Sequence, residues 1–184
     1  MKGLLEMPEI MLELVDAGGV TQGVAEKIAA HEAPGLLHRA FSVFLFDESG
    51  RMALQRRAAG KYHWPGVLSN ACCGHPFPGE SPRVAAQRRV REELGLDVEL
   101  VPAGTVTYRH ADAQTGLVEH EFNHLYVGRI SGPPQPDPDE VSEVRMVTAA
   151  ELAQLLEADS FSGWFLTVLG AARVAFAQFT QEIY

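Results

Sequence analysis

The segment that most restricts the possible fold runs from Gly74 to Leu96, with the sequence GHPFPGESPRVAAQRRVREELGL. Ser81 followed by Pro82 is a typical helix start, with serine at the N-cap and proline in the first turn. Gly95 is a typical residue at a helix end. The segment therefore predicts one regular helix of about 13 residues, entered and left through loops that contain glycine.

Apolar and alternating segments on either side of this helix predict β-strands. Two of them are separated by the turn-forming residues Asp47 to Gly50 and predict a β-hairpin. Thr148 and Glu151 have the spacing of a capping box, which predicts a further helix start. This order predicts an α+β domain in which helices pack on a mixed sheet. The expected strands are residues 39–46, 51–57, 98–109, 116–130 and 143–147, and the last amphipathic helix is expected at about residues 163–179.

Length and composition narrow the class of protein. The 184 residues suit a single domain over residues 1–184, with residues 1–13 as a flexible N-terminal segment and the four-proline stretch 131–140 as a surface loop. A net charge of −9 without a basic stripe argues against nucleic-acid binding. We see neither a secretion signal nor an apolar run of membrane-spanning length. Cys72 and Cys73 are adjacent and poorly placed for a mutual disulfide, so free thiols and a cytoplasmic location are expected.

Three carboxylates belong to the helical segment: Glu80 before the helix, and Glu92 and Glu93 near its end. Hard oxygen ligands of this kind suit Mg²⁺ that is shared with substrate phosphate. A solvated helix with an ordinary pair between Arg89 and Glu93 is the simpler alternative. The spacing of the glycines, proline and acids resembles the Nudix box, which favours the metal. Nudix hydrolases usually have glutamate at the position of Arg89, so this box is better suited to hold a diphosphate intact than to activate water with several metal ions.

A second group of possible ligands is dispersed along the chain. Glu119 and Glu121 are two residues apart on an expected strand, so both face the same side and His120 faces away. Together with three histidines they form a candidate nitrogen and oxygen site for one divalent ion. Spacing alone leaves this site open, because a single histidine is more often structural than a ligand. The candidate histidines are His31, His38 and His75, whereas His63, His110, His120 and His124 are interpreted as structural or surface residues.

Several short motifs together resemble the type I, Nudix-fold isopentenyl diphosphate delta-isomerases. The resemblance runs from about residue 14 to the C-terminus, and its motifs lie in six separate segments. It supports the metal site that spacing left open. The motifs are Lys27 with His31 and His38, Trp64-Pro65-Gly66, Cys73-Gly74-His75-Pro76, Tyr108-Arg109, Glu119-His120-Glu121 and Phe161-Ser162-Gly163-Trp164.

The resemblance implies an enzyme that interconverts isopentenyl diphosphate and dimethylallyl diphosphate by a 1,3-allylic proton shift through a tertiary carbocation. It implies proton transfer by Cys73 and Glu121, with Tyr108 as a hydrogen-bonding neighbour, and cation stabilisation by the face of Trp164. The order of proton transfer stays open, as does the oligomeric state. The implied diphosphate-binding residues are Lys27, Arg57 and Lys61, and the implied metal ligands are His31, His38, His75, Glu119, Glu121 and Glu93. Mn²⁺, Mg²⁺ and Zn²⁺ are all compatible with the His/Glu site, and Mg²⁺ is expected with the diphosphate.

Two other functions share part of this sequence pattern. A Nudix hydrolase of a nucleoside diphosphate derivative would share the box, but Arg89 and the Cys73-Gly74-His75 triplet argue against it. A metal-binding relative without enzymatic activity would be expected to have lost reactive residues, and Cys73, Tyr108, Glu119, Glu121 and Trp164 are all present.

Overall fold

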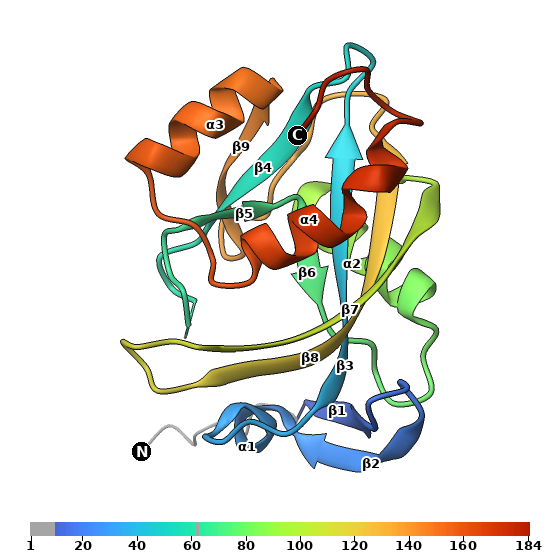
Figure 1. Ribbon diagram of the computed structural model, residues 1–184, viewed down its shortest axis with the longest axis vertical. Coiled ribbons are helices and arrows are strands. Elements are labelled where there is room, and N and C mark those ends of the chain that lie inside the picture. The colour runs from blue at the N-terminus through green and yellow to red at the C-terminus, as the bar shows by residue number, and fades with distance from the viewer. Residues whose placement is uncertain (1–9, 62) are drawn as a thin grey trace, which may run out of the picture.

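The computed structural model describes residues 10–61 and 63–184, which form a nine-stranded mixed sheet and four helices (Figure 1). Of the N-terminal segment expected to be flexible, residues 1–9 lie outside the described residues, and Met11–Glu13 belong to the first strand. The strands are β1 (Met11–Val15), β2 (Thr21–Glu26), β3 (His38–Phe46), β4 (Met52–Arg57), β5 (Leu68–Asn70), β6 (Cys72–Gly74), β7 (Leu100–Ala111), β8 (Val118–Arg129) and β9 (Val141–Val147). The helices are α1 (Lys27–His31), α2 (Pro82–Leu94), α3 (Ala149–Ala158) and α4 (Phe165–Phe176).

Strand β3 is the centre of the sheet. It pairs in parallel with β8 over its full length and antiparallel with β6, while β1 and β4 contact its two ends. Nearly all of its nine side chains are buried, as expected for a strand with protein on both faces. Its neighbours determine where the functional residues of other segments lie.

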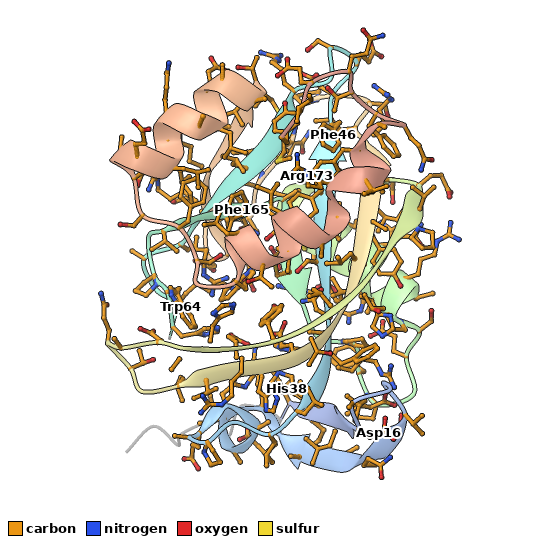
Figure 2. All side chains as sticks on the ribbon, in the orientation of Figure 1. Asp16, His38, Phe46, Trp64, Phe165 and Arg173 are labelled. Carbon is orange, nitrogen blue, oxygen red and sulfur yellow. The ribbon has the colours of Figure 1, made fainter. Side chains whose placement is uncertain are left out.

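Helices cover the sheet on both faces (Figure 1). Phe41, Val43 and Leu45 of β3 pack in the apolar cluster that includes α2. Phe44 and Phe46 alternate with them and pack in a second cluster with α4. Figure 2 shows Phe46 and Phe165 on the α4 side of the sheet. The arrangement confirms the predicted α+β fold.

The predicted hairpin is wrong over most of its length. Its turn is present, with the Asp47 carboxylate accepting hydrogen bonds from the backbone N–H groups of Ser49 and Arg51. However, β3 and β4 are in register only at Phe46 and Met52. Beyond that point β6 occupies the edge of β3 that a hairpin partner would use, and β4 pairs with β5 and β9. Strand β6 has only three residues, too few to produce a visible alternation.

The other predicted elements agree closely with the structure. Helix α2 has the expected bounds and ends at Gly95 in the left-handed conformation, with φ 65°. Ser81 is its N-cap residue but makes no side-chain capping hydrogen bond. The capping box of Thr148 and Glu151 is confirmed. The two long strands pair antiparallel as β7 and β8, and the last helix is shorter than expected.

The proline-rich segment 131–140 is a loop that is attached to the end of α2. The backbone N–H of Gln135 donates to the carbonyl of Leu94, and that of Asp137 donates to the carbonyl of Glu93. At its far end, the backbone N–H of Ala58 donates to the carbonyl of Glu140. The loop therefore has a defined position beside the C-terminal end of α2.

We expect Phe165→Ala to lower the free energy of unfolding by about 3–5 kcal/mol, because the ring is fully buried between α4 and the sheet. Leu166→Ala is a matched control on the next position, where the side chain is 61% exposed. It should change the free energy of unfolding by less than about 0.5 kcal/mol. Chemical denaturation of both variants measures the difference, and equal losses would contradict this assignment of the core.

Candidate metal centre and active site

Three neighbouring strands place side chains of the site next to one another. In the parallel register of β3 and β8, His38 lies opposite Glu121. In the antiparallel register of β7 and β8, Tyr108 also lies opposite Glu121. Glu119 is two residues away on the same face of β8. Sheet pairing alone thus assembles four residues that are up to 83 positions apart in the chain.

Two histidines join them from outside these strands. His31 ends α1, whose N-cap residue Glu26 accepts a hydrogen bond from the backbone N–H of Ala29. His75 follows β6 directly. The candidate ligand atoms of His31, His38, His75, Glu119 and Glu121 all lie within 4.8 Å of one another. In the view of Figure 2, His38 is labelled between the β7–β8 hairpin and the region of β1, β2 and α1.

Backbone carbonyls orient two of the imidazoles toward the centre of this cluster. Nδ1 of His31 lies 2.6 Å from the Lys27 carbonyl, and Nδ1 of His38 lies 2.8 Å from the Leu36 carbonyl. A carbonyl only accepts, so each Nδ1 donates and each Nε2 points inward. Such outer hydrogen bonds are typical of metal-binding histidines, because they fix the tautomer that leaves Nε2 free to bind.

Two buried carboxylates in the five-residue cluster require compensating positive charge. Burial, together with the neighbouring Glu119 carboxylate, raises the pKa of Glu121 to about 8. Burial would also raise the pKa of Glu119, but hydrogen bonds from His31 and His63 hold it well below its usual value. Burial and the neighbouring His75 lower the pKa of His38 to about 4, so this ring is neutral at pH 7. A divalent ion fits here, because three nitrogens and two carboxylates converge and an ion can replace the protons that they would otherwise share.

Cys73 lies on β6 opposite Ser42 of β3. Ser42 is four residues after His38 on the same strand, so Ser42, Cys73 and His38 share one face of the sheet. The Sγ of Cys73 lies 3.1 Å from Oδ1 of Asn70 and 3.5 Å from Oγ of Ser42. Burial raises the pKa of the Cys73 thiol to about 11. The side chain is thus a protonated thiol that donates to Asn70. Cys72 faces the opposite side and is fully buried in the apolar cluster with α2.

Glu121 is held by two neighbours besides the histidines. The Tyr108 hydroxyl donates to its Oε2, and Nδ2 of Asn123 donates to the same oxygen over 2.8 Å. Asn123 also contacts the Tyr108 hydroxyl at 3.0 Å. The carboxyl group therefore has one fixed orientation, with Oε1 toward the histidines.

Cys73, Tyr108, Glu119, Glu121 and Trp164 line one cavity of about 210 Å³, a size that suits a small molecule. Trp164 is 4% exposed, and the ring of Trp64 packs edge-on against it with centroids 5.2 Å apart. In the view of Figure 2, Trp64 lies between α4 and the β7–β8 hairpin. The aromatic wall thus comes from two segments 100 residues apart.

Basic residues also line this cavity. Lys27, Arg57, Lys61, Arg88 and Arg89 all line it. Lys61 pairs with Glu140, and Nη2 of Arg89 lies 2.6 Å from Oε1 of Glu93 and 3.1 Å from Oε1 of Glu140. Cationic side chains beside a metal cluster provide the charge that binding an anionic small molecule requires.

The comparisons with known proteins identify the family. Residues 36–167 match the NUDIX domain family. The isopentenyl-diphosphate Delta-isomerase of Streptomyces griseus is 64% identical over 172 residues, which cover 93% of this chain and 87% of that protein. The enzyme of the same name from Nocardia farcinica is 46% identical over 169 residues, 91% of this chain and 97% of that protein. The chain belongs to the Nudix-fold isopentenyl-diphosphate Delta-isomerases.

Solved structures resemble the fold of this isomerase family member at low sequence identity. A Deinococcus radiodurans protein, DR0079, has a TM-score of 0.71 at 20% identity, covering 88% of this chain and 98% of its own. The NUDIX domain of Shewanella oneidensis NrtR, solved with ADP ribose, has a TM-score of 0.58 at 19% identity, covering 76% and 87%. At these identities the likeness establishes the fold alone.

Most of the predicted site residues line one cavity. Two of them, Glu93 and Arg57, also make contacts within the protein. Glu93 is outside the five-residue cluster and pairs with Arg89, the helix pair that sequence offered as the simpler alternative. Arg57 uses Nε and Nη2 to donate to the carbonyls of Trp64 and His63. Lys27 and Lys61 also line the cavity.

His63 was interpreted from the sequence as a structural or surface residue, and it is outside the five-residue ligand group. It is buried, its Nε2 contacts Oε1 of Glu119, and it lines the cavity, a proximity to the site that the sequence did not predict. No spacing pattern in the sequence identifies a single histidine next to Trp64 as a neighbour of Glu119. Asn70 and Asn123 were also missed, because buried amides next to reactive groups have no sequence signature. His120 lies away from the cluster, with Nδ1 2.9 Å from the Gly35 carbonyl.

We expect His38→Ala to weaken binding of a divalent ion by at least about tenfold, because Nε2 of His38 points into the cluster. The measurement is metal content after equilibrium dialysis against Mn²⁺, Zn²⁺ or Mg²⁺ in turn. His110→Ala is the control, since His110 contacts Thr167 on α4 outside the cluster. Unchanged affinity in His38→Ala, with all ions, would refute the site.

Proposed function

We propose that the protein interconverts isopentenyl diphosphate and dimethylallyl diphosphate by moving one proton to the substrate and removing another. The observation that supports this function best is that a protonated thiol, Cys73, and a buried carboxyl group, Glu121, line the same cavity as the basic residues. An isomerase of this kind needs both a donor and an acceptor within reach of the carbon skeleton.

Protonation of the terminal methylene carbon of isopentenyl diphosphate breaks the double bond and leaves a tertiary cation at the next carbon. Removal of a proton from the carbon adjacent to C1 then forms the new double bond, so the net composition is unchanged. Cys73 and Glu121 carry out these two steps from opposite sides of the substrate. The face of Trp164 stabilises the cation, which in a desolvated setting contributes about 2 kcal/mol.

The hydrogen bonds around Glu121 prepare it for this role. Tyr108 and Asn123 hold Oε2, so the carboxyl group keeps its orientation when its proton is gained or lost. Asn70 and Ser42 do the same for the thiol of Cys73. A divalent ion held by the three histidines, Glu119 and Glu121 would neutralise the carboxylates and set the acidity of Glu121; Mn²⁺, Mg²⁺ and Zn²⁺ all suit these donors.

Diphosphate binding is assigned to the basic part of the cavity. Lys27, Arg57 and Lys61 bind the diphosphate, with the two lysines as point charges. Arg57 also donates from Nε and Nη2 to the carbonyls of Trp64 and His63. Mg²⁺ would accompany the diphosphate, and Glu93 would be the carboxylate that holds it. Hydrolysis of a nucleoside diphosphate derivative is less well supported, because Arg89 replaces a carboxylate and ion-pairs with Glu93.

The site accounts for a small prenyl diphosphate as the ligand, without a nucleic acid or membrane partner. Among the described residues, no helix is long and apolar enough to cross a membrane. Cys72 and Cys73 are both free thiols, which persist in a reducing compartment, and we place the enzyme in the cytoplasm on that ground.

We expect Cys73→Ala to reduce isomerisation by about 10²–10⁴-fold, the usual effect of losing a general acid or base. The assay follows isopentenyl diphosphate by proton NMR in D₂O with Mg²⁺, where wild type should produce dimethylallyl methyl signals with deuterium incorporated. Cys72→Ala is the matched control and should retain activity, because Cys72 faces away from the cavity. Full activity of Cys73→Ala, or release of free phosphate by wild type, would refute the assignment.

A further inference from the structure

Glu140 places a negative charge among the cations of the cavity. Its carboxylate pairs with Lys61 and lies 3.1 Å from Nη2 of Arg89. Burial alone would raise the pKa of Glu140, but these cations lower it, so the group is ionised at neutral pH. A site that binds a dianion or trianion therefore already contains an anion of its own.

The position of Glu140 is determined by the backbone and does not depend on its ion pairs. The backbone N–H groups of Glu140 and Val141 both donate to the carbonyl of Asp137, whose own N–H donates to the carbonyl of Glu93. On the other side, Ala58 donates to the carbonyl of Glu140 and accepts from the backbone N–H of Lys61. The proline-rich loop thus fixes the main chain of Glu140 next to both Lys61 and the end of α2.

Of the three acids around Arg89, Glu140 is the one that a ligand can displace most easily. Glu93 is 4% exposed and also accepts a hydrogen bond from Gln55, so moving it would leave buried groups unpaired. The Glu92 side chain is 44% exposed and lies on the outer part of α2. Glu140 is 27% exposed, and it alone of the three pairs with Lys61 as well as Arg89.

We propose that Glu140 is a built-in competitor of the diphosphate: its carboxylate occupies Lys61 and Arg89, and a phosphate group has to displace it in order to bind. Carboxylate and phosphate oxygens accept from a guanidinium in the same geometry, so one can replace the other without rearranging the cations. This inference rests on the proposed function for the identity of the substrate.

The competition weakens the binding of substrate and product alike. Uniform binding lowers KM without raising kcat, and excess affinity for a diphosphate would retain the product. A negative charge at position 140 offsets that affinity without taking part in proton transfer, since the ion pairs of Glu140 are with Lys61 and Arg89. Glu140 is thus a residue that sets affinity, and has no part in the chemistry.

Glu140→Gln tests this proposal, because it removes the charge while keeping the size of the side chain. Binding of inorganic pyrophosphate is measured by isothermal titration calorimetry on the metal-retaining protein, with and without added Mg²⁺. We expect Glu140→Gln to bind pyrophosphate about tenfold more tightly under both conditions, the effect of removing one partly screened like charge. Glu140→Ala is a second variant that should show the same direction.

Glu143→Gln is the matched control. It removes the same charge three residues away on β9, where Glu143 pairs with Arg56 and Arg145 outside the cavity. Its affinity for pyrophosphate should equal that of wild type, and thermal unfolding verifies that all variants are folded. In the isomerase assay, Glu140→Gln should lower KM by a similar factor without raising kcat.

Unchanged or weaker pyrophosphate binding in Glu140→Gln would overturn the proposal, as would the absence of binding to any variant. Weaker binding with Mg²⁺ alone would instead identify Glu140 as a metal ligand and also overturn it. The proposed function is judged separately, because pyrophosphate binding requires no isomerisation. If Glu140→Gln binds pyrophosphate more tightly but the wild-type protein does not isomerise isopentenyl diphosphate, the proposed function is refuted and the role of Glu140 as a competitor stands.

Discussion

The site depends on the compensation of two buried carboxylates, Glu119 and Glu121, on one strand. Unpaired, they would be very costly to bury, because neither retains much contact with water. The parallel register of β3 and β8 solves part of this problem by setting His38 beside Glu121. The remainder requires His31 and His75 from other segments. Three imidazoles and two acids therefore form one electrostatic unit that could hold a divalent ion.

The N-terminal segment is essential to that unit. The NUDIX domain match begins at residue 36, so His31 and Lys27 lie outside it. They are supplied by α1, which follows the β1–β2 pair at the edge of the sheet. Glu13 of β1 connects this addition to the domain, because it pairs with Arg39 and accepts from the backbone N–H of Gly79 in the loop before α2. The same contact therefore links the segment that supplies His31 with the loop that follows His75.

Sequence predicted the local features that depend on a few neighbouring residues. The bounds of α2 follow from Pro82 and Gly95, and the capping box follows from Thr148 and Glu151. Prediction from the sequence failed where the position of an element depends on residues that are distant in the chain. The three-residue strand β6 occupies the edge of β3, and this displaces the expected hairpin partner. His63 reaches Glu119 only because its loop returns to the sheet, a proximity that no spacing in the chain encodes.

The two charged regions of the cavity place opposite demands on one ligand. The His/Glu cluster favours positive charge, whereas Lys61 and its neighbours favour negative charge. A molecule with a diphosphate at one end and a transient carbocation at the other matches both, and the cation would form near Glu121 and the ring of Trp164. Besides these charged groups, the cavity is lined by neutral ones: the protonated thiol of Cys73 and the rings of Tyr108 and Trp164. That neutrality matters, because an ionised nucleophile next to a tertiary cation would capture it. Burial raises the pKa of the Cys73 thiol to about 11, so the sulfur keeps its proton at neutral pH and is a poor nucleophile.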